Sequence, residues 1–219
     1  MTSPRKRAVV FISGGGSNMM ALVAAAKAGD YPAEIVGVIS DKADAGGLAK
    51  AAAEGIATFA FARKDYASKE AHEEAIFAAL DELSPDILCL AGYMRLLSGT
   101  FIQRYEGRMI NIHPSLLPLF PGLHTHQRAI DAGMRIAGCT VHFVTEGMDE
   151  GPVVGQAAVP VLSDDTADTL AARVLTVEHQ IYPQALRLFA EGKVRMEGGK
   201  AVRTADASAT TATGAVISA

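Results

Sequence analysis

The chain has 219 residues, of which 49% are hydrophobic and 20% are charged, and its formal net charge is −4. A chain of this length can bury a full core and fits one α/β domain better than two. Its lysines and arginines are scattered, apart from a solvated cluster predicted at Arg5-Lys6-Arg7, so it offers no basic groove for nucleic acid. No stretch approaches the roughly 20 apolar residues of a membrane-spanning helix. Cys89 and Cys139 lie within apolar runs, which favours buried thiols in a reducing, cytoplasmic compartment over a disulfide.

Short apolar runs alternate with helical patterns through the first half of the chain. We predict helices after Ser17-Asn18, near 45–54 and over 68–83, between buried strands at 7–13, 34–40, 57–61, 86–92 and 109–113. Because these strands are apolar throughout, they indicate an open, mostly parallel, Rossmann-like α/β sheet with helices on both faces.

The pattern changes in the second half. IAGCTVHFVTEG (136–147) and VVGQAAVPVL (153–162) predict two long strands joined by a turn too short for a crossover helix, so we expect an antiparallel pair. A long helix is predicted over 167–193, where Pro183 should kink or break it. The Ala/Thr/Ser-rich residues 205–219 predict a disordered tail after a single domain at 1–204.

A glycine loop, Gly14-Gly15-Gly16-Ser17-Asn18, follows the first predicted strand. Backbone N–H groups at a helix N-terminus can cradle a phosphate there. No Gly-Lys-Ser/Thr follows, and Met19 stands where a dinucleotide fingerprint has its third glycine. We therefore favour a monophosphate site over the alternative, a tight turn in which Ser17 caps the helix.

The stretch NIHPSLLPLFPG (111–122) places Asn111 and His113 two residues apart at a strand end, so both side chains should face the same side. An amide can donate to a developing oxyanion, and an imidazole can move a proton near neutral pH. The three prolines that follow should stiffen the exit. The turn MDEGP supplies Asp149 as a carboxylate that could orient the imidazole. These residues alone leave catalysis and a structural role equally open.

A zinc site is the rival interpretation of the histidines. His124 and His126 form an HxH pair, and His113 and His142 lie elsewhere. However, the sequence has no HExxH or CxxC spacing and neither cysteine is near a histidine cluster, so we predict no metal.

Several motifs together resemble phosphoribosylglycinamide formyltransferase, a folate-dependent family of de novo purine (IMP) biosynthesis. The resemblance covers about residues 7–197, and the motifs that carry it are SGGGSN, LAGYMRLLS, NIHPSLLPLFPGLHTHQRAI, GCTVHFVTEGMDEGPVVGQAAVPV and RVLTVEHQIYP. It implies the formyltransferase fold, with a nucleotide-binding half at about 7–105 and a folate and catalytic half at about 106–197.

The resemblance also implies a reaction: the amine of glycinamide ribonucleotide takes the formyl group of the co-substrate 10-formyltetrahydrofolate. Asn111, His113 and Asp149 match the family's catalytic residues. Asn111 and His113 would stabilise the oxyanion, while Asp149 would keep His113 charged and assist proton transfer, through water.

Further site residues follow from the same resemblance. Those matching the ribonucleotide site are Gly15, Gly16, Ser17, Asn18 and Glu178. Those matching the folate site, in addition to Asn111 and Asp149, are Lys69, Met94, Arg95, Leu96, Leu97, Val144, Thr145, Glu146, Gly147 and Met148.

Two departures from the family pattern keep alternatives open. Gly15 stands where relatives often carry a side chain, and the turn reads DEGP instead of DGGP. The DEGP spelling occurs in formyltetrahydrofolate deformylases, which pass the formyl group to water but carry an extra N-terminal domain. A non-catalytic nucleotide- or folate-binding protein on the same fold is the third possibility. We expect small-molecule substrates, a monomer or homodimer, and no nucleic-acid or membrane partner.

Overall fold

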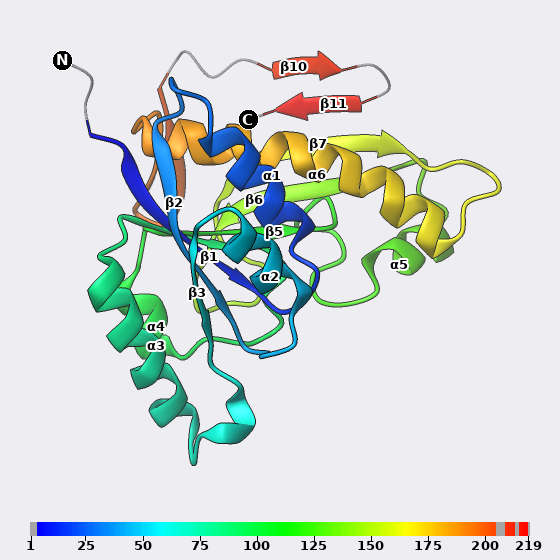
Figure 1. Cartoon of the computed structure of the whole chain (residues 1–219). Helices are drawn as coiled ribbons and strands as arrows, with labels where there is room; N and C mark the ends of the chain where they lie inside the picture. Colours follow the sequence, from blue (N-terminus) through cyan, green and yellow to red (C-terminus); the bar gives the residue numbers. More distant parts are fainter. Residues whose placement is uncertain (1–3, 205–208, 213–214, 219) are drawn as a thin grey trace. The chain divides into compact units, whose positions relative to one another are not determined.

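The computed structural model describes residues 4–204, 209–212 and 215–218. The chain forms two compact units, Met1–Ile110 and Asn111–Ala219. Figure 1 shows the helices and strands of both units in chain order.

The first unit is a parallel α/β layer, as the alternating pattern predicts. Its strands pair in the order β4-β1-β2-β3, and every pairing among them is parallel. Their bounds are β1 Lys6–Ile12, β2 Ala33–Ser40, β3 Ala57–Ala60 and β4 Ile87–Leu90. The helices are α1 Ser17–Ala26, α2 Gly46–Ala53, α3 Lys69–Leu83 and α4 Gly99–Arg104, with a 3₁₀ turn η1 at Arg63–Asp65. The sequence did not predict α4 and η1, which are both short.

The core of this unit forms around its central strand. Residues 8–12 of β1 are fully buried, because β2 and β4 flank the strand and helices cover the sheet. Gly37 in β2 lets α3 approach closely, since a Cβ atom there would lie 2.6 Å from Leu83 Cδ1. The helices α1 and α2 contact each other (Figure 1) and end up beside the loop that follows β1.

The second unit contains antiparallel strands. The end of β5 (Met109–His113) lies beside β6 (Ile136–Phe143), and β6 pairs antiparallel with β7 (Val153–Pro160), which confirms the predicted pair. Two helices and two hairpins complete the unit: α5 Thr125–Asp131, α6 Ala167–Ala190, β8 Val194–Glu197 with β9 Lys200–Arg203, and β10 Ala209–Ala212 with β11 Ala215–Ser218.

The long helix α6 is continuous through Pro183, so the predicted break is wrong, while a kink at Pro183 stays a prediction. Proline removes one backbone donor from a helix interior, which weakens it locally. Here Ile181 and Tyr182 before the proline and Ala185 and Leu186 after it are all fully buried. The helix packs on β6 and β7, and this apolar contact outweighs the missing hydrogen bond.

The sequence predicts that the two chain ends are a solvated basic cluster and a disordered tail. The guanidinium of Arg5 donates to the carbonyls of Ala26 and Ala33, and Arg7 donates to the Leu83 carbonyl, so these side chains are structural and not merely solvated. Of the predicted disordered tail, residues 205–208, 213–214 and 219 lie outside the described residues, while β11 pairs with β7. Disorder of the tail and the domain limit at 204 stay predictions.

Candidate active site

The end of β5 brings two of the three predicted catalytic residues to the third. His113 is buried, and its Nδ1 lies 3.4 Å from Asp149 Oδ2. The same carboxylate oxygen accepts the Gly122 backbone N–H at 2.8 Å. Asn111 lies two residues before His113 on β5 and is half-buried. Within the second unit, the structure therefore places the His113 imidazole beside the Asp149 carboxylate, where the two form an ion pair whenever the imidazole is protonated.

His142 is a member of this cluster that the sequence did not predict as functional. Its Nε2 lies 3.1 Å from Asn111 Nδ2 and 3.8 Å from Asp149 Oδ1, and its Nδ1 lies 2.9 Å from the Phe143 carbonyl. Since an amide nitrogen only donates and a carbonyl only accepts, His142 carries its proton on Nδ1 and accepts at Nε2. Burial lowers the pKa of His142 and outweighs the opposing effects of the bond to the Phe143 carbonyl and of the Asp149 carboxylate, which favours this neutral form.

Three backbone features aim these side chains. The pairing of β6 with β7 shifts register between Val141 and His142, and such bulges re-aim side chains beside functional sites. Gly151 then passes so close to β6 that a Cβ atom would lie 1.7 Å from the Phe143 carbonyl oxygen. Asp149 itself has a φ of 58°, a left-handed conformation that non-glycine residues adopt at an energetic cost. Gly151, the single glycine of MDEGP, thus lets the turn fold tightly enough to present Asp149.

The second nitrogen of His113 is held by the exit loop. His113 Nε2 lies 3.0 Å from the Phe120 carbonyl, so this nitrogen carries a hydrogen and donates. Phe120 has a φ of 54° and is followed by Pro121, a setting in which the left-handed region is disfavoured. The hydrogen bond to the Phe120 carbonyl places a hydrogen on Nε2, and the other ring nitrogen, Nδ1, faces Asp149.

Polar side chains hold the exit loop. The Thr140 hydroxyl accepts the Leu117 N–H at 3.0 Å and donates to the Ser115 carbonyl at 2.7 Å. Gln156 donates to the Leu117 carbonyl at 2.9 Å. Thr140 lies on β6 and Gln156 on β7, so the antiparallel pair sets the position of the loop after His113.

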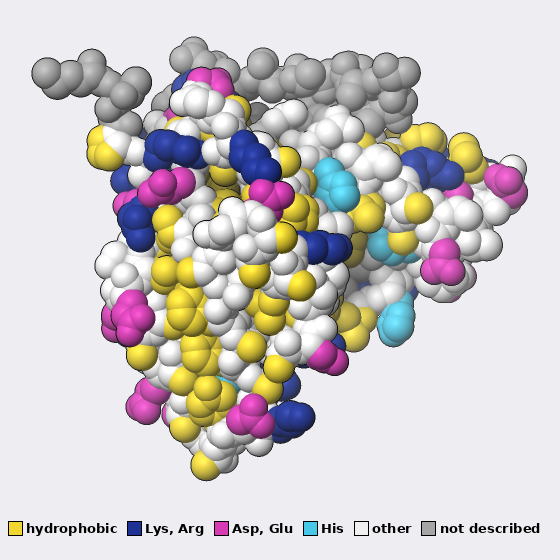
Figure 2. Space-filling model, viewed as in Figure 1, with side chains coloured by type: hydrophobic (Ala, Val, Ile, Leu, Met, Phe, Trp, Pro, Cys, Tyr) yellow, Lys and Arg dark blue, Asp and Glu magenta, His cyan; other side chains and the backbone are white. Residues whose placement is uncertain are grey.

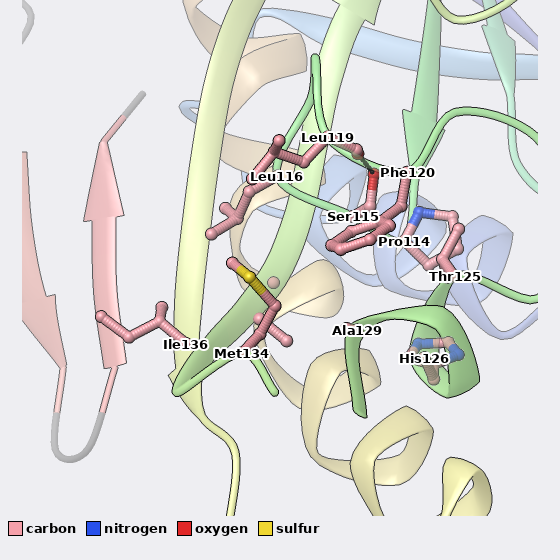
Figure 3. A pocket seen from close by; sticks show the side chains of 12 residues that line it. Pro114, Ser115, Leu116, Leu119, Phe120, Thr125, His126, Ala129, Met134 and Ile136 are labelled. Atoms are coloured by element: carbon pink, nitrogen blue, oxygen red, sulfur yellow. Dashed lines mark hydrogen bonds between the residues drawn. The ribbon is translucent and has the colours of Figure 1, made fainter. Parts of the chain in front are cut away.

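A small pocket lies under the exit loop. Figure 3 shows the Ser115 hydroxyl bonded to the Leu119 carbonyl, at 2.6 Å, beside the ring of Phe120. The pocket offers about 10 Å³, room for one water molecule, so it cannot hold a pterin. His126 lines it from α5, and burial lowers the pKa of this histidine, with the charge of His113 adding to the effect.

The glycine loop lies in the first unit at the start of α1. Gly16, with a φ of 67°, is the N-cap residue, and no side chain caps the helix. Ser17 is the first helical residue, so the alternative in which Ser17 caps the helix is wrong. Gly14, Gly15 and Ser17 are exposed. The N–H groups of the first helical turn thus have no capping side chain among the described residues, as an anion site requires.

The predicted pterin-lining segment follows β4 in the same unit. Met94 and Leu96 are 69% and 71% exposed, unusual for large apolar side chains and consistent with a ligand surface. Three residues that the sequence did not predict anchor the segment. Ser13 Oγ accepts the Met94 N–H at 2.8 Å, the buried Asp41 pairs with Arg95 Nε at 3.0 Å, and the buried Glu73 accepts the Ser98 N–H at 2.8 Å.

The remaining predicted residues occupy both units. Lys69 begins α3 in the first unit, next to the residue whose side chain caps that helix. In the second unit, Glu178 is buried on α6 and the loop after β6, 144–149, carries Met148 with 57% of its surface exposed. Glu150 folds over this loop, because a Cβ atom on Gly147 would lie 2.2 Å from its Oε2. Each residue thus has a definite place within its own unit.

Charge and metal-ligand patterns are unremarkable on the described surface. On the face shown in Figure 2, Lys and Arg side chains are interspersed with Asp and Glu side chains. Among the described residues, no three His, Cys, Asp or Glu side chains are grouped so that they could hold a metal ion. None of the described helices is long and apolar enough to cross a membrane. Cys89 and Cys139 are buried and are not joined in a disulfide, and burial raises the pKa of Cys139.

Comparison with known proteins identifies the family. Residues 6–186 match a family model described as formyl transferase. The chain belongs to the formyl transferase family. It is 46% identical over 188 residues to the phosphoribosylglycinamide formyltransferase of Escherichia coli (strain K12), covering 86% of this chain and 89% of that protein. The resemblance seen in the sequence motifs is thereby confirmed.

Other relatives agree with this placement. A crystal structure of phosphoribosylglycinamide formyltransferase from Brucella melitensis shares 74% identity and a TM-score of 0.83, covering 85% of this chain and 96% of that one. The chain is 49% identical over 199 residues to the trifunctional purine biosynthetic protein adenosine-3 of Bos taurus, and spans 20% of its length. A formyltetrahydrofolate deformylase from Pseudomonas putida KT2440 is more distant, at 27% identity with a TM-score of 0.83, covering 93% and 72% of the two chains. The predicted formyltransferase fold is confirmed.

Proposed function

We propose that this chain transfers the formyl group of 10-formyltetrahydrofolate to the amine of glycinamide ribonucleotide, giving formylglycinamide ribonucleotide and tetrahydrofolate. The observation that carries the proposal is the cluster of Asn111, His113, Asp149 and His142, in which an amide donor and an imidazole–carboxylate pair meet. Its members suit acyl transfer between two amines, a reaction that needs charge stabilisation and proton movement.

The reaction passes through a tetrahedral intermediate. The substrate amine forms a bond to the formyl carbon, and the formyl oxygen takes up the electron pair of its double bond. When the intermediate collapses, the bond from carbon to the folate N10 breaks, the amine loses a proton and N10 gains one. The charge that develops on the formyl oxygen is the main feature that the enzyme has to stabilise.

Asn111 suits the role of oxyanion donor. One of its two amide hydrogens is donated to His142 Nε2, which fixes the amide plane. The second amide hydrogen remains for the oxyanion. Because His142 is neutral and accepting, it orients Asn111 without adding a competing charge.

His113 and Asp149 suit the proton-transfer role. With Nε2–H on the Phe120 carbonyl, a protonated His113 carries its second proton on Nδ1, 3.4 Å from Asp149. The resulting imidazolium–carboxylate pair stabilises negative charge nearby and offers a carboxylate to the amine proton, through water. Direct donation from Nε2 to the oxyanion requires the bond to Phe120 to be exchanged for one to the substrate.

The two substrates are assigned to the predicted binding residues. Gly15, Gly16, Ser17 and Asn18 would bind the ribonucleotide phosphate through backbone N–H groups, and Glu178 would hold the ribose. The folate would take Lys69, the segment 94–97 and the loop 144–149. 10-Formyltetrahydrofolate serves as co-substrate, and no metal is assigned. A cytoplasmic location and a monomeric or homodimeric state remain predictions.

An activity assay tests the proposal against its alternatives. We expect tetrahydrofolate release from 10-formyltetrahydrofolate to depend strictly on glycinamide ribonucleotide and to match formylated nucleotide in amount. Release without the nucleotide would support the deformylase alternative and contradict the transferase. Binding of both ligands with no turnover would support the non-catalytic alternative.

A further inference from the structure

The helix α2 makes two hydrogen bonds to the glycine loop that the proposed substrate contacts do not explain. The Gly47 N–H donates to the Gly14 carbonyl at 3.0 Å, and Lys50 Nζ donates to the Gly15 carbonyl at 2.8 Å. The side chain of Lys50 is exposed, and among the described residues it makes no other hydrogen bond or ion pair. Among the described residues, the ammonium of Lys50 therefore bonds to the glycine loop and not to a carboxylate.

The geometry of the peptide group links these two bonds to the N–H groups of the loop. In a trans peptide, the carbonyl of one residue and the N–H of the next point in opposite directions. Holding the Gly14 and Gly15 carbonyls toward α2 therefore turns the N–H groups of Gly15 and Gly16 away from α2. Together with the N–H groups of the first turn of α1, these donors would face the phosphate that the proposed function assigns to this loop.

Close packing of two glycines makes the contact possible. A Cβ atom on Gly47 would lie 3.1 Å from the Gly14 carbonyl oxygen, 3.2 Å from Gly16 Cα and 2.5 Å from Ile12 Cδ1. A Cβ atom on Gly16, which has a φ of 67°, would lie 2.8 Å from Met19 Cε and 3.1 Å from Gly47 Cα. Any side chain at position 47 would push α2 and Lys50 away from the loop.

We infer that Gly47 and Lys50 are positioning residues for the nucleotide phosphate, because they hold two loop carbonyls so that the N–H groups of Gly15 and Gly16 face the ligand. This inference rests on the proposed function, in which the glycine loop binds the phosphate. The Lys50 ammonium has further hydrogens beyond the one bonded to Gly15, and its charge also favours a dianion nearby. The positioning role is separable from that general attraction.

Steady-state kinetics of the full chain tests the inference. We expect Lys50→Met to raise the KM for glycinamide ribonucleotide about 2- to 10-fold, the loss of one hydrogen bond, with little change in kcat or in the KM for 10-formyltetrahydrofolate. Lys50→Arg, which keeps a donor, should restore the KM for the nucleotide. Lys27 lies at the opposite end of α1, where its 61% exposed side chain pairs with Glu54. Lys27→Met removes the same charge as Lys50→Met and should leave both KM values and kcat unchanged.

Salt dependence separates positioning from general attraction. At about 1 M salt the Debye length is about 3 Å, so an effect of charge alone should vanish. We expect the ratio of the nucleotide KM of Lys50→Met to that of the unaltered chain to persist there. A ratio that falls to one, an equal rise in the folate KM, or an Arg variant as impaired as the Met variant would overturn the inference.

Two further measurements keep the inference distinct from the proposed function. Gly16→Ala disturbs the loop itself and should raise both the nucleotide KM and the inhibition constant of inorganic phosphate. If neither Gly16→Ala nor Lys50→Met changes these constants, the assignment of the loop fails. If Gly16→Ala changes them and Lys50→Met does not, only the role of Lys50 fails. Gly47→Ala should raise the KM for the nucleotide more than Lys50→Met does. A thermal unfolding scan of the Gly47→Ala variant shows whether the chain is still folded, so that an effect on the loop can be told from misfolding.

Discussion

The two loops that carry the proposed chemistry are built in opposite ways. The exit loop after β5 is held by side chains: Thr140 and Gln156 fix its backbone, and His113 and Asp149 bond to it in turn. The glycine loop before α1 offers backbone N–H groups, and its residues 14–16 have no side chains at all. A site of placed side chains can move protons and stabilise a developing charge. A site of backbone donors can bind a phosphate but cannot carry out the chemistry, so substitutions should affect the two loops differently.

The largest effect should come from the imidazole–carboxylate pair. His113→Ala and Asp149→Ala should each lower kcat by about 10²–10⁴-fold, because each removes one partner of the proton-transfer pair. Their KM for the nucleotide should stay close to normal, since the phosphate loop is untouched. The double variant should lose little more than either single variant if the two residues act as a unit. Near-normal turnover in either single variant would refute the assigned roles.

The oxyanion donor and its orienting histidine give the next effect. Asn111→Ala should lower kcat by about 10²–10³-fold, as loss of an oxyanion donor does. His142→Gln should cost about 10-fold, the value of one hydrogen bond that orients the amide. In a double-mutant cycle, His142→Gln should have almost no further effect once Asn111 is alanine. Additive losses would show that His142 acts on something other than Asn111.

The histidines also predict how stability depends on pH. Burial lowers the pKa of His126, His142 and His179 in the folded state. The unfolded chain therefore binds more protons, and stability should fall as the pH drops below about 6.5, the unperturbed pKa of histidine. The Tm of the His142→Gln variant should decrease less than the Tm of the unaltered chain when the pH is lowered from about 7.5 to about 5.5, a range that spans the unperturbed pKa of histidine. An equal fall in both would remove His142 as a source of the pH dependence.

The smallest effect should come from the side chain of Ser17. If the phosphate is bound by backbone donors, Ser17→Ala should raise the nucleotide KM by no more than about 2- to 10-fold, the value of one side-chain hydrogen bond. The value of kcat should not change. A loss as large as that of His113→Ala would mean that the glycine loop, too, works through side chains, and the contrast between the loops would not hold.

Much of this architecture can be predicted from local sequence. The apolar strand runs predict the parallel sheet of the first unit and the antiparallel pair of β6 and β7, and strand geometry predicts that Asn111 and His113 share a side. The predicted break at Pro183 is wrong because local sequence does not reveal how deeply this face of the helix is buried against the rest of its unit. Propensity acts over a few residues, while tertiary packing decides such cases.

The parts of the site that local sequence does not reveal depend on distant pairing. His142 lies 31 residues from Asn111, Gln156 lies 39 residues from Leu117, and Asp41 lies 54 residues from Arg95. Only the fold brings such groups together, so no spacing in the sequence marks them. One signal was available for His142: a histidine inside the apolar run CTVHFV needs a hydrogen-bond partner if it is buried.

The central claim is that the formyl group passes to an amine of the nucleotide and not to water. The most direct test is to supply 10-formyltetrahydrofolate labelled with ¹³C in the formyl group, together with glycinamide ribonucleotide, and to follow the label by NMR. We predict that the label appears in the formamide of formylglycinamide ribonucleotide. Accumulation of labelled formate, with the nucleotide left unformylated, would contradict the account.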